Sequence, residues 1–451
     1  MGTGYVGMAC ALGLADLGWR VHGYDILPER IDRLRRGIPP YREPGIAESL
    51  RKHIDAGGIA FFDSLDAAAR DARIVIVAVG TPSRDDGSAD LAPLKAAIDQ
   101  LAGVEFTHWP TIVIRSTVPP GTSDKLAAQI EGWADLIYAP EFLREGSAVK
   151  DFLNPDRIVI GTDQPASAVT YVNLLERLQK PVVFTSRCNA ELIKGCSNAY
   201  LALKISFANE VANMCDTFGA SSDDVLRGIG YDQRIGSEFL RPGIGFGGPC
   251  FEKDVKSMAH LAEQHGLGRE LFAATLRINS AQPLRLVDIL EYEMRTLSNA
   301  TIGIWGLAFK AGTDDIRDSL ALRIIDELGS RSTRMVVFDP AVRIAPLPPG
   351  SRMVTSALEA THADALLVLT EWPEFALIDP LTYARNLQRR IVVDGRNVLD
   401  SERVAAAGLT YRGVGRSLPR RAQHGAMPAN TQIGAFTSAG QPGAFTSAAE
   451  I

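Results

Sequence analysis

Two kinds of hydrophobic pattern alternate along the first 160 residues. Short runs of β-branched and other apolar residues are separated by stretches in which apolar residues recur at helical spacing. The runs that predict strands are "RVHGYDI", "RIVIVAVG", "TIVIRSTV", "DLIYAP" and "RIVIG", which begin at residues 20, 73, 111, 135 and 157. Strands that alternate with helices predict a parallel α/β sheet.

The pattern becomes helical in the middle of the chain. From Asn189 to Phe218 there is no proline, Gly195 is the only glycine, and apolar residues keep helical spacing for about eight turns. This predicts one long helix that forms a spine between domains. Helical patterns continue to about residue 297, interrupted by the segment "GIGFGGPCFEKD" at 243–254. Strands and helices then alternate again, with strands predicted in "TIGIWGLAF", "RMVVFDP", "ADALLVLT" and "RIVVDGRNVL".

These patterns predict an α/β protein with two Rossmann-like doubly wound domains joined by a long central helix and a helical middle domain. The predicted boundaries are 1–188, 189–297 and 298–415. Residues 416–451 contain the repeat "GAFTSA" and are rich in Gly, Ser and Ala. With little apolar surface to bury, this tail is predicted to be disordered.

Composition narrows the class of protein. A chain of 451 residues is too long for one core, and 46% hydrophobic with 22% charged residues is typical of a globular protein. A net charge of -6 gives no reason to expect nucleic acid or an acidic membrane as a partner. The five cysteines show neither a disulfide framework nor zinc-site spacing, so no metal is predicted. Without a membrane-spanning run or a signal sequence, we predict a cytoplasmic protein.

Residues 2–7, "GTGYVG", match the dinucleotide-binding pattern GxGxxG at Gly2, Gly4 and Gly7. Glycines at these positions permit a tight turn, close approach of the backbone to a pyrophosphate, and close packing of the following helix. Asp25 ends the next predicted strand, where a carboxylate binds a ribose 2′-hydroxyl and repels a 2′-phosphate. Together these residues favour NAD over NADP; the alternative is a turn beside an unrelated acidic residue.

The first strand of the N-terminal domain is expected to be missing, because the glycine pattern begins at residue 2. In a doubly wound sheet this strand is central, and its loss would leave neighbouring strands with unpaired backbone groups. Either the true start of the protein lies upstream or this form is damaged. We favour the first explanation because the rest of the chain is intact, and the intact mass of the native protein tests it.

Several polar residues follow predicted strands or share a helix face. "VGTPS" and "RSTVPPGT" end strands where α/β sheets bind ligands, although turn chemistry alone also explains them. Glu141 and Glu145 would share one face if their segment were helical, and a solvated charged face is the alternative. Lys194 and Asn198 are one turn apart on the long helix, where a lysine either extends to solvent or stabilises an oxyanion.

Cys250 is the strongest candidate for catalysis. Glycines and a proline before it allow a ligand to approach closely, and Lys253 would favour the nucleophilic thiolate. A thiolate can capture an aldehyde covalently and hold the resulting acyl group. The alternative is a packed structural cysteine, which is the interpretation we give to Cys10, Cys188, Cys196 and Cys215.

Taken together, residues 2 to about 412 resemble the UDP-glucose/GDP-mannose dehydrogenase family. The resemblance is carried by the motifs above and by "YREPGI", "APEFLREGSAVKDFLNPDRIVIG", "GLAFKAGTDDIRDS" and "DGRNVLD", while "YDQRIGSEFL" resembles the UDP-glucose branch. It implies that UDP-glucose is oxidised to UDP-glucuronate with two NAD and one water, through a thiohemiacetal and a thioester on cysteine. GDP-mannose as substrate is one alternative. An inactive protein that only binds nucleotide sugars, shortened at its N-terminus, is another.

The resemblance also assigns roles to residues, and we expect a homodimer or a higher homo-oligomer formed through the long helix. The implied catalytic residues are Cys250, Lys194, Asp254, Asn198, Glu145 and Thr117. The implied NAD-binding residues are Gly2, Gly4, Tyr5, Val6, Gly7, Asp25, Arg30, Thr81, Thr117, Glu145, Lys253 and Arg317. The implied substrate-binding residues are Glu141, Phe142, Leu143, Lys194, Asn198, Arg234, Gly247, Lys310 and Arg396, of which Arg234 would reach a neighbouring subunit's site. Pro249, Phe251 and Glu252 depart from the family pattern but leave Cys250, Lys253 and Asp254 in register.

Overall fold

The structure is a computed structural model that describes residues 1–416. The tail predicted for 416–451 therefore lies, apart from Arg416, outside the described residues. Of the helices within 1–416, none is long and apolar enough to cross a membrane.

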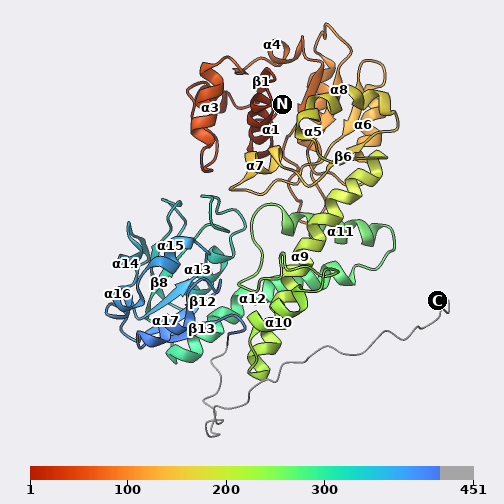
Figure 1. Ribbon diagram of the computed structural model, residues 1–451. Helices are drawn as coiled ribbons and strands as arrows, with labels where there is room; N and C mark the ends of the chain where they lie inside the picture. Colours follow the sequence, from red (N-terminus) through yellow and green to blue (C-terminus); the bar gives the residue numbers. More distant parts are fainter. Residues whose placement is uncertain (417–451) are drawn as a thin grey trace, which may run out of the picture. The chain divides into compact units, whose positions relative to one another are not determined.

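The N-terminal α/β region contains two sheets instead of one (Figure 1). Strands β1 (Val21–Tyr24) and β2 (Ile59–Phe62) form a parallel pair. A five-stranded sheet has the order β3-β4-β5-β6-β7, with strands β3 (Ile74–Val77), β4 (Thr111–Ile114), β5 (Asp135–Tyr138), β6 (Ile158–Gly161) and β7 (Val182–Thr185). The helices of this region are α1 (Tyr5–Asp16), α2 (Pro28–Arg35), α3 (Ile46–Asp55), α4 (Leu65–Ala69), α5 (Ala92–Ala102), α6 (Thr122–Ile130), α7 (Ala148–Leu153), α8 (Pro165–Leu175) and the short 3₁₀ helix η1 (Glu176–Leu178).

Within the described residues no strand precedes α1, and the backbone of residues 1 and 2 lies between the two sheets. The Gly2 N–H donates to the Tyr24 carbonyl at the end of β1, and the Met1 carbonyl accepts from the Ala78 N–H just beyond β3. These two hydrogen bonds connect β1 to β3 where a doubly wound sheet would have its first strand.

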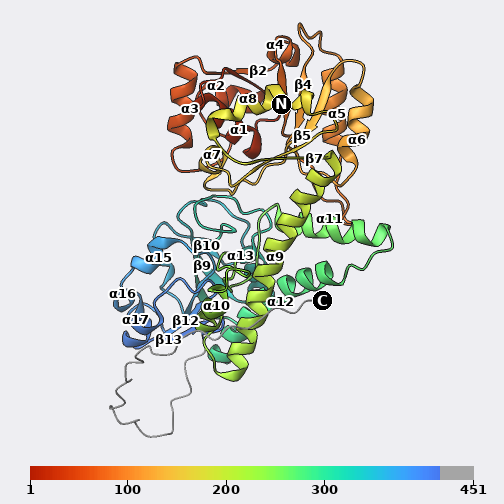
Figure 2. The same cartoon turned by 45° about the vertical axis from the view of Figure 1, so that its right-hand side comes forward.

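The middle of the chain is helical. Helix α9 (Arg187–Phe218) is followed by α10 (Ser222–Gly230), α11 (Phe251–Gln264) and α12 (Glu270–Met294). Helix α9 is unbroken over its 32 residues because the Ser186 hydroxyl caps its N-terminus and Gly219 ends it in the left-handed conformation. Helices α9 and α12 pack side by side (Figure 2).

The C-terminal region has a single six-stranded sheet in the order β10-β9-β8-β11-β12-β13. All neighbouring strands in it are parallel. The strands are β8 (Thr301–Trp305), β9 (Arg334–Phe338), β10 (Arg352–Met353), β11 (Ala365–Val368), β12 (Ile391–Asp394) and β13 (Thr410–Gly413). The helices are α13 (Leu320–Ser330), α14 (Ala357–Ala360), α15 (Pro373–Leu377), α16 (Pro380–Ala384) and α17 (Ser401–Ala406).

The predicted α/β fold class, its strand runs and the long helix are confirmed. Four short strands were not predicted, namely β2, β7, β10 and β13. The expectation of a wholly parallel N-terminal sheet is wrong at one point, since β5 and β6 pair antiparallel through Tyr138 and Gly161. The boundaries at residues 188 and 297 stay predictions.

Candidate active site

The glycine-rich turn before α1 has the geometry of a dinucleotide-binding turn. Gly2 has φ +82, a left-handed conformation that favours glycine. A Cβ at Gly7 would lie 1.8 Å from the Gly2 carbonyl oxygen, so the helix and turn pack in direct contact there. Gly4 has no atom within 4 Å of a Cβ position and caps α1 without a side-chain hydrogen bond. Open space and free N–H groups at a helix N-terminus suit a pyrophosphate, so these residues fit NAD.

Asp25 lies directly after β1 and contacts the glycine-rich turn through its carboxylate. Its carboxylate accepts from the Thr3 N–H at 2.8 Å and forms an ion pair with Arg30 at 2.9 Å. Burial opposes its charge, but hydrogen bonds from Thr3, Leu27 and Arg30 outweigh that effect and lower the pKa of the Asp25 carboxyl. A charged carboxylate at this point can accept a hydrogen bond from a ribose hydroxyl.

Of the other predicted NAD residues of this domain, Tyr5 and Val6 begin the helix after the turn, and Thr81 and Thr117 lie in the loops after β3 and β4. The Tyr5 hydroxyl donates to the Arg144 carbonyl at 2.8 Å, while Val6 packs against the core beneath α1. The Thr81 hydroxyl donates to the Thr117 carbonyl at 2.7 Å, which joins the loops that follow β3 and β4.

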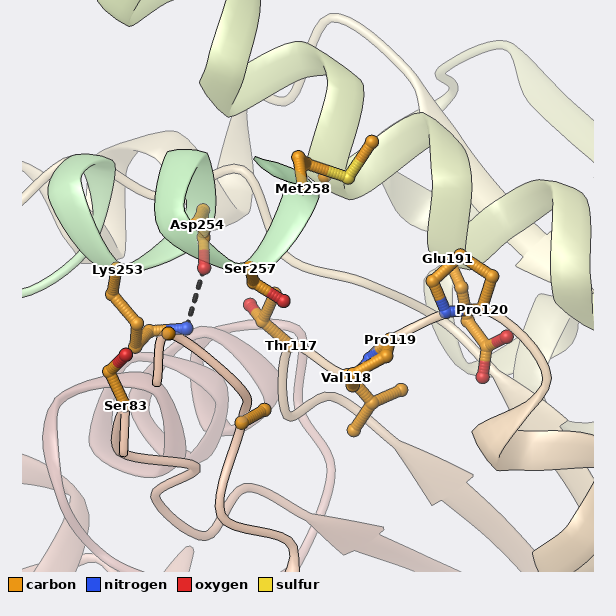
Figure 3. A pocket seen from close by; sticks show the side chains of 13 residues that line it. Ser83, Thr117, Val118, Pro119, Pro120, Glu191, Lys253, Asp254, Ser257 and Met258 are labelled. Atoms are coloured by element: carbon orange, nitrogen blue, oxygen red, sulfur yellow. Dashed lines mark hydrogen bonds and ion pairs between the residues drawn. The ribbon is translucent and has the colours of Figure 1, made fainter. Parts of the chain in front are cut away.

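Cys250 caps the N-terminus of α11, one turn before Asp254. The Asp254 carboxylate is buried, accepts from the Asn198 amide at 2.6 Å and pairs with Lys253 at 2.5 Å. Figure 3 shows Lys253 and Asp254 beside a pocket that Thr117 lines from the loop after β4. The structure therefore brings residues of the N-terminal domain together with the cysteine helix.

Lys194 lies on α9 one turn before Asn198 and forms an ion pair with Glu141 at 3.0 Å. Both side chains are buried. Burial opposes the charge on Lys194, but the carboxylates of Glu141 and Asp254 outweigh it and raise the pKa of the ammonium. Lys194 is accordingly a fixed positive charge beside the cysteine helix, which is the requirement for an oxyanion stabiliser.

Phe142 and Leu143 continue the segment after β5. The Leu143 N–H donates to the other oxygen of Glu141 at 2.6 Å, which fixes the orientation of this carboxylate. The Arg157 guanidinium stacks on the Phe142 ring at 3.6 Å, and Lys194 lies 5.4 Å from the same ring.

The Cys250 thiol is less acidic than the sequence suggested. Lys253 and Lys194 do favour the thiolate, as expected. However, burial together with the negative charges of Asp254 and Glu141 has the larger effect and raises the pKa of Cys250 to about 12. Lys253 thus favours the thiolate, as the sequence predicts, but it is paired with Asp254 and does not offset the opposing effects.

Glu145 belongs to a second charged cluster, and its segment is not helical. Residues 141–147 form an irregular turn, so Glu141 and Glu145 do not share a helix face. The Arg317 guanidinium lies 3.6 Å from Glu145 and 2.5 Å from Asp315. Burial and the charge of Asp315 raise the pKa of Glu145 to about 7, although Arg317 and Lys310 act in the opposite direction. The solvated face considered as an alternative is also excluded, because the Glu145 side chain is only 11% exposed.

The loop before Cys250 contacts the C-terminal domain. A Cβ at Gly247 would lie 2.7 Å from the Asp318 carbonyl oxygen, so only glycine permits this close approach. The Arg396 guanidinium donates to the Gly245 carbonyl at 3.1 Å and to the Phe309 carbonyl at 3.2 Å. Lys310 follows Phe309 in the chain, and burial lowers the pKa of its ammonium.

Arg234 does not join these clusters. Its side chain is almost fully exposed and pairs with Asp232 at 2.6 Å. In this single chain it contacts none of the predicted catalytic residues through a hydrogen bond or ion pair.

Three residues that reach the site were missed by sequence reasoning. Asp315 flanks Glu145, Arg157 stacks on Phe142, and buried Glu191 accepts from the Gly121 and Ser123 N–H groups beside the pocket of Figure 3. The motif "GTDDIRDS" contains Asp315, so the pairing of Asp315 with Arg317 two residues later was an available signal.

The domains of one known family match nearly all of the described chain. The UDP-glucose/GDP-mannose dehydrogenase family matches with its NAD binding domain at residues 1–182, its central domain at 188–281 and its UDP binding domain at 303–401. UDP-glucose 6-dehydrogenase TuaD of Bacillus subtilis is 37% identical over 432 residues, which is 93% of each chain. UDP-glucose 6-dehydrogenase AglM of Haloferax volcanii is 39% identical over 88% of this chain and 96% of its own.

Solved structures agree with these sequence matches. A UDP-glucose dehydrogenase from Pyrobaculum islandicum superposes with a TM-score of 0.84 at 36% identity, covering 92% of this chain and 96% of its own. A UDP-D-ManNAc dehydrogenase from Pyrococcus horikoshii has a TM-score of 0.81 at 28% identity, covering 92% and 98%. The fold and site thus define an NAD-dependent oxidoreductase that acts on nucleotide sugars. The chain belongs to the UDP-glucose/GDP-mannose dehydrogenase family.

Proposed function

We propose that the protein oxidises UDP-glucose to UDP-glucuronate, with two NAD and one water consumed for each sugar. The observation that carries this proposal is that the charges of Lys194 and Asp254 act on Cys250, while Asp254 lines the pocket beside the loops that follow β3 and β4. Oxidation beyond the aldehyde needs a nucleophile that retains the aldehyde, and Cys250 has the chemistry for it. The relatives named above support UDP-glucose as the substrate.

NAD, held by the glycine turn and Asp25, would supply the hydride acceptor for both oxidation steps. The Cys250 sulfur adds to the aldehyde carbon, so that a C–S bond forms while the C=O π bond breaks and the thiol proton passes to the oxygen. The second oxidation converts this thiohemiacetal into a thioester. Water then attacks the thioester carbon, the C–S bond breaks, and the sulfur regains a proton as the carboxylate is released.

Lys194 and Asp254 are suited to the charge and proton transfers of this sequence. The Lys194 ammonium, held by Glu141 at 3.0 Å, stabilises negative charge on the substrate oxygen as sulfur or water adds. Asp254, held by Asn198 and Lys253, accepts the proton of the attacking water. Because its surroundings raise the pKa of the Cys250 thiol, we propose that the thiol loses its proton as the C–S bond forms. Glu145 and Thr117 are proposed to orient water in the same space.

The C-terminal domain is proposed to hold the nucleotide sugar. Lys310 and Arg396 lie beside the loop that contains Gly247 and carry the positive charge that a diphosphate requires. We propose that Arg317 leaves its ion pairs with Glu145 and Asp315 and contacts NAD instead. Because Arg234 is exposed in this chain, we propose that it reaches the site of a second subunit.

The test is the number of NADH formed for each UDP-glucose consumed, compared with GDP-mannose under the same conditions. Two NADH per UDP-glucose, with little turnover of GDP-mannose, are expected. The Cys250→Ser variant should bind UDP-glucose but form no acid, and substantial UDP-glucuronate from it would overturn the role of the thiol. Heat stabilisation by UDP-glucose without any NADH would instead favour a protein that only binds the nucleotide sugar.

We also propose that two copies associate through α9. Tyr200, Phe207 and Met214 recur every seven residues along this helix, and each is about half exposed. Such a seven-residue apolar repeat lies along one side of a helix and suits packing against a second helix. Phe207→Glu should convert a dimer to a monomer in sedimentation velocity, whereas Val169→Glu on α8 serves as a matched exposed control.

A further inference from the structure

The loop before Cys250 is held by two buried asparagines that none of the predicted roles includes. Asn279, from α12, accepts from the Phe246 N–H at 2.7 Å and donates to the Phe246 carbonyl at 2.9 Å. Asn209, from α9, accepts from the Gly243 N–H at 2.8 Å. Both side chains are at least 98% buried. The two amides thus satisfy backbone groups that the irregular loop cannot pair with itself.

Asn279 makes the more specific contact of the two. Its donor and its acceptor engage the N–H and the carbonyl of one residue, as a neighbouring β-strand would. Gly245, immediately before, has φ +105, and a Cβ there would lie 2.5 Å from the Asn279 side-chain oxygen. The amide therefore lies in direct contact with the loop backbone and leaves no space for a side chain at position 245.

The constraint passes from Asn279 to Cys250 through two aromatic rings. The Phe246 ring packs edge-to-face on the Phe251 ring, with centroids 6.0 Å apart and planes at 86°. Phe251 is the first residue of α11 and follows Cys250 directly. Phe246 also packs in one apolar cluster with residues of α9 and α11. A shift of the Phe246 backbone would therefore displace the end of α11 that carries the thiol.

We propose that Asn279 is a positioning residue for Cys250, because its amide fixes Phe246, which packs on Phe251 at the start of the cysteine helix. This inference rests on the proposed function only in taking Cys250 as the nucleophile. Asn279 does not touch the substrate in this proposal. Removing its amide should leave the thiol present and exposed but displaced from the charged groups that surround it.

The test uses Asn279→Leu, which removes both hydrogen bonds, and Asn279→Asp, which keeps the acceptor for the Phe246 N–H. The control is Asn213→Leu. Asn213 donates to the Gln282 amide oxygen at 3.1 Å, which joins the same two helices without touching the loop. Each full-length variant is measured for its melting temperature, for kcat, and for the rate at which iodoacetamide alkylates Cys250. Cys196 on α9 is exposed, as Cys250 is, and serves as the internal standard for alkylation.

For Asn279→Leu we expect kcat to fall at least 10-fold while alkylation of Cys250 relative to Cys196 rises several-fold, because the displaced thiol moves away from the carboxylates of Asp254 and Glu141, whose charges raise its pKa. Asn279→Asp should lie between this variant and the unsubstituted protein. Asn213→Leu should change neither quantity at a comparable loss of melting temperature. If Asn279→Leu matches Asn213→Leu in both, or if its kcat falls only as far as its folded fraction does, the proposal is overturned. Alkylation needs no substrate, so it decides the question even if UDP-glucose proves to be the wrong sugar.

Discussion

Asp25 and Asp339 occupy corresponding positions in the two α/β domains but differ in what surrounds them. Each follows the strand that comes after a turn and a helix, and each accepts from N–H groups of the turn before that helix. Asp25 accepts from the Thr3 N–H, and Asp339 accepts from the Leu307 and Ala308 N–H groups. Each also accepts from the N–H two residues further along the chain, that of Leu27 or of Ala341.

The other partners of the Asp25 and Asp339 carboxylates differ between the two domains. Asp25 pairs with Arg30, a side chain 35% exposed that can move aside for a ribose hydroxyl. Asp339 is 1% exposed and is instead enclosed by the backbone and by the Trp372 indole N–H at 3.3 Å. The same carboxylate position is thus suited to a ligand in one domain and enclosed by the fold in the other. This difference explains why only the N-terminal domain has the arrangement of a dinucleotide site.

The β-sheets of the two domains also differ. The C-terminal sheet is continuous over six strands, whereas the N-terminal domain has a pair and a five-stranded sheet joined through the backbone of residues 1 and 2. We therefore expect perturbations of the C-terminal domain to act mainly on stability, and those of the N-terminal domain to act mainly on NAD binding.

Asp339→Ala should have the largest effect on stability. It leaves the buried N–H groups of Leu307, Ala308 and Ala341 without their acceptor, and each unsatisfied donor costs about 1–3 kcal/mol. We expect a loss of about 4 kcal/mol and a melting temperature lower by roughly 10 °C in calorimetry. Asp25→Ala is the matched control and should lose less than half as much. A larger loss in Asp25→Ala would contradict the assignment of the two carboxylates.

Much of this architecture follows from local sequence patterns. The strand runs and the long helix were predictable because apolar periodicity records which face of an element is buried. Strands β2 and β7 were missed although they are as long as the predicted strands of this domain; both lie at a sheet edge, and Phe184 in β7 is half exposed. The antiparallel pairing of β5 and β6 depends on how the chain crosses the sheet, which periodicity does not report.

The candidate site was predictable in its members but not in its electrostatics. Lys194 and Asn198 lie on one face of α9 because of their spacing, and both reach the cysteine helix or its neighbours. The acidity of Cys250 depends instead on how many charges of each sign surround it. Glu141 lies more than 100 residues away in the chain, so its effect on the thiol required the fold.

Gly7→Ala tests whether the glycine turn of the N-terminal domain binds NAD. Its Cβ would lie 1.8 Å from the Gly2 carbonyl oxygen, so the turn must open and NAD affinity should fall about 10- to 100-fold in calorimetric titration. Gly4→Ala should leave the melting temperature unchanged, because no atom lies within 4 Å of its Cβ position. It should nevertheless weaken NAD binding, because the added methyl group would occupy the space proposed for the pyrophosphate. Gly306→Ala, in the C-terminal turn, would meet Thr370 at 2.4 Å and should spare NAD binding. Equal NAD affinity in the Gly4 variant and the unsubstituted protein would exclude this turn as the pyrophosphate site.

Asp315→Asn tests where the two domains meet, and it should have the smallest effect. Burial and the negative charge of Asp315 raise the pKa of Glu145 to about 7, so removing that charge should lower it. A carboxyl group with a raised pKa stabilises the folded protein most below its unfolded value of about 4.3, and this contribution is lost as the pH rises through about 7. The variant should therefore lose less melting temperature between pH 5 and pH 8 than the unsubstituted protein, and the acidic limb of its kcat/KM profile should move to lower pH by about one unit. Asp314→Asn is the matched control, because Asp314 only accepts from the Arg42 N–H at 3.4 Å. An acidic limb that stays in place in Asp315→Asn would show that Glu145 is not the group that titrates there, and the coupling between the two domains would then have to be assigned to another pair.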